Sequence, residues 1–410
     1  MSFIKENADV TPIVDTVFTI VRQAAEAKAK YGEDAVVDAT IGSLYDESGR
    51  LVAMKSVFDN YNDIDNRIKA KYAGAFLGNE TYRKSVTEWM LANYTTDLYS
   101  SVVATPGGTG AVNLTIDLCL NEGQTLVIPN IAWGSYAIMA NNAGINVKRY
   151  EMFDGDTFNI NSFMNVCQEV MHEQKKLVVV INDPCHNPTG YSMTLNEWEK
   201  VIDFLNELSK MGAVVLLNDV AYIDYSYDLE NVRAYMNHFN KINDNVLISV
   251  AFSCSKLMTS YGLRCGAAIL LGKNEESVKV VEGAFEKAAR SLWSNVNNSA
   301  MENFYEVVTN HRDEFIKEKA EYIELLRQRS SIVVEEAKAC GLPIYPYKEG
   351  FFVTIQCKNT LRDKYHEALL NEKIFTVKVN NGIRIAVCSL PVEKCKGLAV
   401  RMNQILEGCK

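Results

Sequence analysis

The stretch Ser253-Cys254-Ser255-Lys256 combines residue types that could do chemistry. It follows the apolar run 246–252, whose composition indicates a buried strand. A lysine at the end of such a strand is partly desolvated, and desolvation beside other cations lowers the pKa of an amine toward the range where it is nucleophilic. The serine hydroxyls and Arg264 could bind a phosphate nearby. Most lysines after strands are merely solvated, so other segments must decide.

A glycine-rich turn, Thr105-Pro106-Gly107-Gly108-Thr109-Gly110, lies between a predicted strand and a predicted helix. Glycine lets the backbone approach an anion closely, and the first N–H groups of a helix are unpaired and carry a favourable dipole. The turn matches neither G-x-G-x-x-G nor the phosphate loop with its lysine, which argues against a dinucleotide. A nucleophilic lysine beside a phosphate site instead suggests a Schiff base with a phosphorylated aldehyde, namely pyridoxal 5′-phosphate (PLP).

Two more polar segments follow predicted strands. Asn187-Pro188-Thr189-Gly190 comes after one buried run, and Asp219 and Tyr222 come after the next. A proline turn or a helix cap would explain each segment taken alone. Together they put polar groups at the ends of several strands, which is where open α/β sheets bind their ligands.

Seven short apolar runs separated by amphipathic helical stretches predict the elements that must position these residues. Mostly apolar strands alternating with helices indicate a sheet covered on both faces, so we predict a doubly wound α/β domain with a mostly parallel, seven-stranded sheet. The predicted strands are 101–104, 124–129, 145–150, 177–181, 214–218, 246–252 and 265–271, with helices that include 111–120 and 196–211.

The pattern changes after about residue 300. A long charged helix is predicted over 311–339, followed by strands at 351–356, 374–379 and 382–387 and helices at 361–370 and 392–406. We therefore predict an N-terminal segment over 1–50 that joins a small α+β domain, a large PLP-binding domain over 51–305, and the rest of the small domain over 306–410.

Composition narrows the function further. The net charge is -9, with 42 basic and 51 acidic residues, which argues against nucleic-acid and membrane surfaces. The N-terminus lacks the pattern of a signal peptide and no run of 18 apolar residues occurs, so we expect a cytoplasmic protein. The ten cysteines are scattered through apolar segments and the five histidines have no metal-site spacing, so we expect reduced cysteines and no metal.

These motifs, taken in order, resemble those of class I aminotransferases of the aspartate aminotransferase type, PLP enzymes of fold type I, in the aspartate and aromatic branch. The likeness spans nearly the whole chain. It includes the loop 41–49, which contains Gly42 and is similar to the family's substrate-side loop, and Gly382-Ile383-Arg384-Ile385, which is similar to the segment that binds the substrate α-carboxylate.

The resemblance implies a role for each of these residues. Lys256 would anchor PLP and act as general base, Asp219 would hold the proton of the pyridine nitrogen, and Tyr222 and Asn187 would donate to the phenolic oxygen. Trp133 would stack on the ring. The cofactor's phosphate would be bound by Gly108, Thr109, Ser253 and Arg264, with Tyr72 reaching across from a partner subunit.

The implied reaction moves an amino group from aspartate or an aromatic L-amino acid to a 2-oxo acid such as 2-oxoglutarate. It proceeds in two half-reactions through pyridoxamine phosphate, which gives ping-pong kinetics. Substrate would contact Gly42, Trp133, Asn187 and Arg384. The resemblance also implies that Arg290 binds a distal carboxylate and reaches the neighbouring site of a homodimer. Tyr136 departs from the pattern, because the aspartate branch usually has a histidine there.

Two other functions remain open from the sequence. A PLP-dependent lyase or decarboxylase of the same fold would keep Lys256, Asp219 and Arg384 without needing an oxo acid acceptor. A non-catalytic PLP-binding module, as in regulators fused to a DNA-binding domain, would need an N-terminal extension. It is a poorer match because the substrate-side loop begins by about residue 40.

Overall fold

The computed structural model describes residues 3–4 and 16–410 of the 410-residue chain. Residues 1–2 and 5–15 of the predicted N-terminal segment lie outside the described residues. The first helix is α1 (Thr16–Tyr31). In the part of the chain that is described, no helix is long and apolar enough to cross a membrane.

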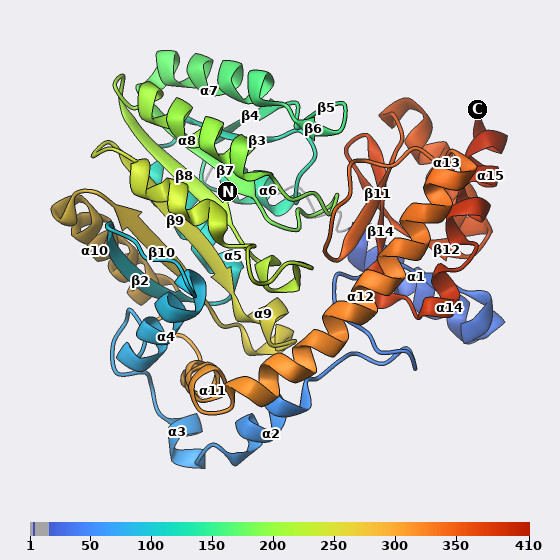
Figure 1. Cartoon of the computed structure of the whole chain (residues 1–410), viewed down its shortest axis with the longest axis horizontal. Coiled ribbons are helices and arrows are strands. Elements are labelled where there is room, and N and C mark those ends of the chain that lie inside the picture. The colour runs from blue at the N-terminus through green and yellow to red at the C-terminus, as the bar shows by residue number, and fades with distance from the viewer. Residues whose placement is uncertain (1–2, 5–15) are drawn as a thin grey trace.

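A seven-stranded sheet forms the centre of the larger part of the molecule (Figure 1). This sheet confirms the predicted fold class. Its strand order is β2-β10-β9-β8-β7-β3-β4. All neighbours are parallel except β10, which runs antiparallel to both β2 and β9. The strands are β2 (Tyr99–Thr105), β3 (Thr125–Pro129), β4 (Asn146–Tyr150), β7 (Lys176–Asn182), β8 (Ala213–Asp219), β9 (Val246–Ser253) and β10 (Gly266–Gly272).

Both faces of this sheet are covered, because successive side chains of each buried strand point to opposite sides. In β7, Leu177 and Val179 join the cluster under helices α7 (Ile160–Gln174) and α8 (Leu195–Leu208). Val178 and Val180 join the cluster on the other face. The helices of that face are α5 (Gly108–Cys119), α6 (Ser135–Asn142) and α10 (Glu275–Leu292). This is the two-sided burial that continuous apolar strands predict.

Short elements complete this part of the molecule. They are α2 (Lys55–Asp63), α3 (Asn66–Ala70), α4 (Glu80–Leu91), β5 (Phe153–Asp154), β6 (Thr157–Phe158), η2 (Ile223–Tyr225), η3 (Ala234–Lys241), α9 (Cys254–Leu257), η4 (Tyr261–Leu263) and α11 (Asn298–Thr309). The short helix η1 (Glu33–Ala35) instead contacts α1, on the side of the smaller sheet. The helix α12 (Arg312–Cys340) then runs from beside α11 to the smaller sheet, without the break that a glycine or proline would introduce (Figure 1).

The smaller sheet is antiparallel, in the order β11-β14-β13. Its strands are β11 (Phe352–Gln356), β13 (Val377–Val379) and β14 (Gly382–Ala386), followed by η5 (Val387–Ser389) and covered by α13 (Asn359–Asn371) and α15 (Leu398–Cys409). A separate parallel pair joins β1 (Val37–Asp38) to β12 (Ile374–Phe375). This pairing ties the N-terminal segment to the C-terminal part of the chain.

Two sequence predictions need correction here. The single strand expected over 374–379 is two strands, because the chain leaves β1 after Phe375 and pairs with β14 from Val377 onward. The single helix expected over 392–406 is α14 (Val392–Cys395) and α15, separated at Gly397. Gly397 has φ 70°, a left-handed conformation that a continuing helix does not allow.

Candidate active site at the strand ends

Lys256 lies directly after β9, in the short helix α9. Ser253 caps this helix, since its Oγ accepts a hydrogen bond from the N–H of Ser255 at 3.3 Å. The Lys256 amine donates to the carbonyl oxygen of Gly42 at 2.6 Å and lies 4.7 Å from the centre of the Tyr261 ring. The loop that follows β1 therefore closes over the lysine.

The environment of Lys256 makes its amine easy to deprotonate. Burial lowers its pKa from 10.5 to about 8, and the positive charges of Arg384 and Arg264 act in the same direction. Near neutral pH, part of the protein molecules therefore carry a neutral Lys256 amine, which can accept a proton or attack a carbonyl carbon.

Asp219 ends β8, directly beside Asn182, which ends the neighbouring strand β7. Its Oδ2 accepts a hydrogen bond from the Tyr136 hydroxyl at 2.5 Å, and its Oδ1 accepts one from the N–H of Ala221 at 3.1 Å. Burial raises the pKa of Asp219, while the Tyr136 hydrogen bond opposes that change. The pKa of Tyr136 is itself far above its usual value because of burial, so this residue acts as a neutral donor. Its ring meets that of Trp133 edge to face at 5.4 Å.

Arg384 reaches the same region from β14 of the smaller sheet. It donates to the carbonyl oxygen of Thr40 at 2.8 Å and to Oδ1 of Asn187 at 3.3 Å, and its guanidinium lies 4.3 Å from the centre of the Phe352 ring. Burial lowers its pKa. Its buried Nε has no hydrogen-bond partner, so this arginine retains donor capacity for a ligand.

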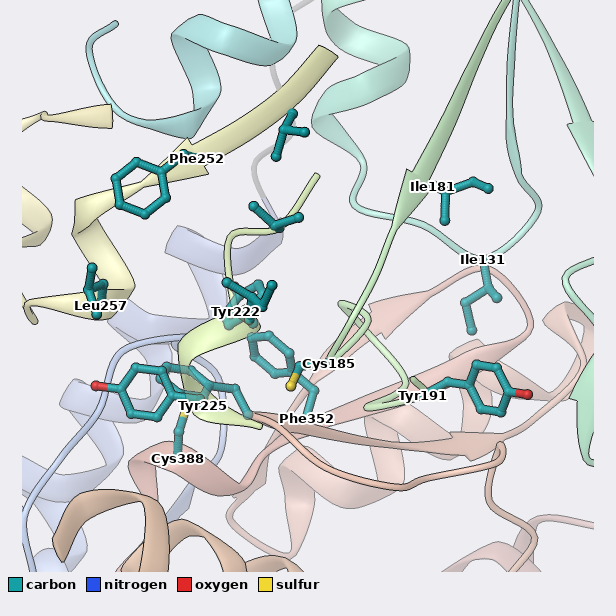
Figure 2. Packing of buried hydrophobic residues seen from close by; sticks show 14 of the residues in the cluster. Ile131, Ile181, Cys185, Tyr191, Tyr222, Tyr225, Phe252, Leu257, Phe352 and Cys388 are labelled. Atoms are coloured by element: carbon teal, nitrogen blue, oxygen red, sulfur yellow. The ribbon is translucent and has the colours of Figure 1, made fainter. Parts of the chain in front are cut away.

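Tyr222 lies on an aromatic layer beneath the site. Its ring packs edge to face against Phe351 at 5.2 Å and Phe352 at 5.5 Å. Figure 2 shows Tyr222 beside Phe352 and Cys185, with Tyr225 and Cys388 in the same packed layer. The layer fixes the position of the Tyr222 ring while leaving the Lys256 amine 5.5 Å from its centre.

The glycine-rich turn, α9 and Arg264 meet to form a cradle. Gly107 has φ 76°, and a Cβ on it would lie 2.5 Å from Nη2 of Arg264. A Cβ on Gly108, the first residue of α5, would lie 3.2 Å from Cβ of Ser253. The Arg264 guanidinium is held by Ser255 Oγ at 3.1 Å and by two backbone carbonyls. Backbone N–H groups, hydroxyls and a guanidinium thus converge, as a phosphate group requires.

A cavity of about 850 Å³ opens beside these groups, between the two sheets. Six of the predicted site residues line it, namely Gly42, Trp133, Asn187, Tyr222, Lys256 and Arg384. Asp219 accepts a hydrogen bond from Tyr136, whose ring packs against Trp133 in the cavity lining. The cradle joins the lining through α9, the helix that carries Lys256. Of the cradle residues, Thr109 is exposed on the first turn of α5.

Two predicted site residues do not reach this cavity within the chain. Tyr72 has 83% of its surface exposed, in the loop after α3. Arg290 donates to Ser294 Oγ at 2.5 Å and lies 4.8 Å from the centre of the Phe76 ring. The N–H of Ala73 donates to Asn295 at 3.2 Å, so both residues belong to one surface region.

Sequence reasoning did not single out Phe352, which faces both Tyr222 and Arg384, or Tyr261, whose hydroxyl accepts from the N–H of Leu44 at 2.9 Å. Neither residue carries a signal of its own, because aromatic residues in such segments are most often ordinary core residues. Among the described residues, no three His, Cys, Asp or Glu side chains gather in a way that could hold a metal ion.

Comparison with known proteins agrees with this geometry. The family model for aminotransferase class I and II matches residues 35–402. The aromatic-amino-acid aminotransferase of Paracoccus denitrificans is 26% identical over 63% of this chain and 64% of its own length. The aspartate aminotransferase of Escherichia coli K12 is 28% identical over 63% and 65%. These matches span just under two thirds of each curated relative.

Solved structures extend the likeness over the whole fold. An aminotransferase from Anaerococcus prevotii superimposes with a TM-score of 0.94 at 32% identity, covering 98% of this chain and 100% of that one. An aromatic-amino-acid aminotransferase from Burkholderia pseudomallei, covalently bound to pyridoxal phosphate, gives 0.81 at 22% identity, covering 99% and 100%. The resemblance predicted from the motifs is confirmed, and the chain belongs to the aminotransferase class I and II family.

Proposed function

We propose that this protein is a PLP-dependent aminotransferase. It would move an amino group from aspartate or an aromatic L-amino acid to a 2-oxo acid such as 2-oxoglutarate, with ping-pong kinetics. The observation that carries the proposal is the half-buried Lys256 amine, with its pKa lowered to about 8, in a cavity it shares with Arg384.

The residues present fit the cofactor. Because Gly107 and Gly108 lack a Cβ, Arg264 and Ser253 can lie close to the turn that would bind the cofactor's phosphate. Gly108, Thr109, Ser253 and Arg264 would hold the phosphate, Trp133 would cover the ring, and Asn187, Asp219 and Tyr222 would hold its polar atoms. PLP, when bound, supplies an aldehyde that condenses with amines and a ring that accepts the electron pair released from Cα.

The chain's own groups would supply binding and proton transfer. Arg384 has a free, buried Nε and a fixed guanidinium plane, so it would bind the substrate α-carboxylate and set the direction of the Cα–H bond. The Lys256 amine would accept the Cα proton, because a pKa near the working pH suits a general base. Asp219, whose charge Tyr136 supports, would stabilise a cation at the ring nitrogen.

A panel of amino donors tests this function, with 2-oxoglutarate as acceptor and glutamate formation as the signal. We expect turnover with at least one acidic or aromatic donor and loss of turnover by more than about 10³-fold in Lys256→Ala. Lys148→Ala is the matched control, since this lysine pairs with Glu169 on a helix outside the cavity. Release of pyruvate and ammonia without an acceptor would favour a lyase and contradict the proposal.

We further propose that the protein works as a homodimer. Tyr72 and Arg290 fail to reach the cavity of their own chain but share one surface region, so a second copy would have to bring them to a site.

A further inference from the structure

The loop 41–49 covers Lys256 and contacts it through its backbone. The carbonyl oxygen of Gly42 accepts a hydrogen bond from the amine at 2.6 Å. Further along the loop, the N–H of Leu44 donates to the Tyr261 hydroxyl at 2.9 Å, and the Tyr261 ring lies 4.7 Å from the amine. Ordering one loop residue costs about as much free energy as one hydrogen bond contributes, so these two bonds alone do not fix the loop.

The far end of the loop is a closed turn. The N–H of Asp46 donates to the carbonyl oxygen of Arg50 at 2.8 Å. Oδ1 of Asp46 accepts hydrogen bonds from the N–H groups of Ser48 and Arg50, each at 2.9 Å. Gly49 has φ 74°, and its N–H donates to the carbonyl oxygen of Asp46 at 3.1 Å. Because the turn is held by its own hydrogen bonds, a side chain that anchors the turn anchors the loop with it.

The side chain of Glu47, in this turn, pairs with a buried arginine of α12, the long helix that runs to the smaller sheet (Figure 1). Arg329 donates to Oε1 of Glu47 from Nη2 at 2.6 Å and from Nε at 3.1 Å. The Arg329 side chain is fully buried, whereas 48% of the Glu47 side chain is exposed. Removing the carboxylate would leave a buried guanidinium without a counter-charge, which is costly. The pair therefore holds Glu47 against α12.

The same ion pair joins the loop to the C-terminal part of the chain. Nη1 of Arg329 donates to the carbonyl oxygen of Cys388, in η5, at 3.0 Å. That carbonyl also accepts the N–H of Tyr45 at 3.0 Å. The Glu47 carboxylate accepts the N–H of Val392, the first residue of α14, at 3.0 Å. The loop, α12, η5 and α14 thus meet at one ion pair.

We propose that Glu47 and Arg329 are positioning residues for Lys256, because their ion pair holds the loop 41–49 where the Gly42 carbonyl covers the amine. No hydrogen bond or ion pair joins either residue to Lys256 within residues 16–410, so both act through the loop. Loss of the pair should let the loop move away and admit water to Lys256. This inference rests on the proposed function, which gives the Lys256 amine its importance.

Water at Lys256 would change the amine measurably. Burial is the main reason that its pKa lies at about 8. Water admitted by a displaced loop would relieve this burial and replace the Gly42 carbonyl as hydrogen-bond acceptor, so the pKa should rise toward 10.5. The other titratable and charged groups that face the amine belong to segments outside the loop, and they are Arg264, Arg384, Cys388, Tyr222 and Tyr261.

Acylation of the cofactor-free protein with acetic anhydride at a series of pH values, followed by peptide mapping, tests the pair. In Glu47→Gln we expect the pH midpoint of Lys256 acylation to rise by about one unit or more. Glu393→Gln is the matched control and should leave the midpoint unchanged, since Glu393 lies in α14 but pairs with Lys396. Lys319 is the internal control: it is buried in α12 with a pKa of about 8, and its modification should be the same in Glu47→Gln as in the unmodified protein.

A second variant guards against instability caused by an unpaired Arg329. Combining Glu47→Ala with Arg329→Met removes both charges, so no unpaired charge is buried, and the Lys256 midpoint should rise as in Glu47→Gln. An unchanged Lys256 midpoint in both variants would overturn the proposal. Equal changes at Lys256 and Lys319 would also overturn it, because they would show that the pair only stabilises the fold. The measurement needs no cofactor and no turnover, so a failure to transaminate any donor would refute the proposed function without affecting this result.

Discussion

The Lys256 amine combines burial and two nearby guanidinium groups with a place in the cavity lining. The pKa of Lys319 is also lowered to about 8, but Lys319 pairs with Asp224 at 3.7 Å and does not line that cavity. The pKa of Lys256 is lowered to about 8, whereas that of Lys148 is raised above 10.5 by the hydrogen bond to Glu169. Only the neutral amine is nucleophilic, so reactivity must rise as the pH increases through the pKa. Lys256 and Lys148 should therefore respond to pH in different ranges.

We predict that acylation of Lys256 in the cofactor-free protein reaches half its maximal rate near pH 8. Lys148 should show no plateau below pH 10, because its pKa lies higher. Peptide mapping by mass spectrometry after brief exposure to acetic anhydride measures both residues in one sample. A shared pH profile for the two lysines would show that Lys256 is not perturbed.

Tyr136 is expected to control the ionisation of Asp219, because it donates the hydrogen bond that opposes the effect of burial. In Tyr136→Phe the pKa of Asp219 should rise, so the acid limb of the pH–rate profile should move to higher pH and kcat should fall about tenfold. Tyr150→Phe is the control, since its hydroxyl contacts only the carbonyl of Val180 at 3.4 Å. An unchanged acid limb in Tyr136→Phe would remove Tyr136 from this role.

The sequence predicts which side chains lie at the site better than it predicts the contacts that they make. Lys256, Asn187, Tyr222 and Arg384 all line the cavity or contact it, because each follows or occupies a strand whose apolar pattern is clear. The acceptor for the Lys256 amine is a backbone carbonyl 214 positions away, and a carbonyl has no sequence signature.

Among the elements, all seven strands of the large sheet were predicted. The five inner strands are almost entirely buried and mostly apolar, whereas the edge strands β2 and β4 carry exposed residues. One of the two errors arose where apolar character continues through a change of structure. Residues 374–379 are apolar on both sides of the point where the chain changes partner, so nothing marks the switch. The break between α14 and α15 did have a signal, since Gly397 stands in the predicted helix.

The turn before α5 should tolerate no side chain at Gly107. Alanine there would adopt φ 76° and place its Cβ 2.5 Å from Arg264 Nη2. We predict that Gly107→Ala weakens PLP binding about tenfold or more, measured as the Kd of the cofactor for the cofactor-free protein. Gly283→Ala in α10 meets nothing within 4 Å, so it should leave the Kd unchanged and raise the free energy of unfolding by about 0.5–1 kcal/mol. Equal Kd values for both variants would contradict the cradle.

For the whole molecule, the cavity lies between two sheets built from distant parts of the sequence. Loop residues after β1 and the strand β14 both contact the site, through Gly42 and Arg384. The division into 1–50, 51–305 and 306–410 stays a prediction. Segment 72–76 and the end of α10 form an exposed region that includes Tyr72, Phe76 and Leu292.

We predict that this region forms the dimer interface. Leu292→Asp should shift the protein from dimer toward monomer in sedimentation experiments, because a buried unpaired carboxylate destabilises an apolar contact. Val280→Asp, on the same helix and similarly exposed, should leave the dimer intact. A monomeric unmodified protein, or equal effects of the two variants, would contradict this interface.

Lys256 is the residue that we propose binds PLP covalently in this cavity. Borohydride reduction of the PLP-loaded protein, followed by peptide mapping, tests this proposal most directly. We predict a single phosphopyridoxyl group on Lys256, lost together with the visible absorbance in Lys256→Ala. A phosphopyridoxyl group on another lysine, or bound PLP with full visible absorbance in Lys256→Ala, would contradict it.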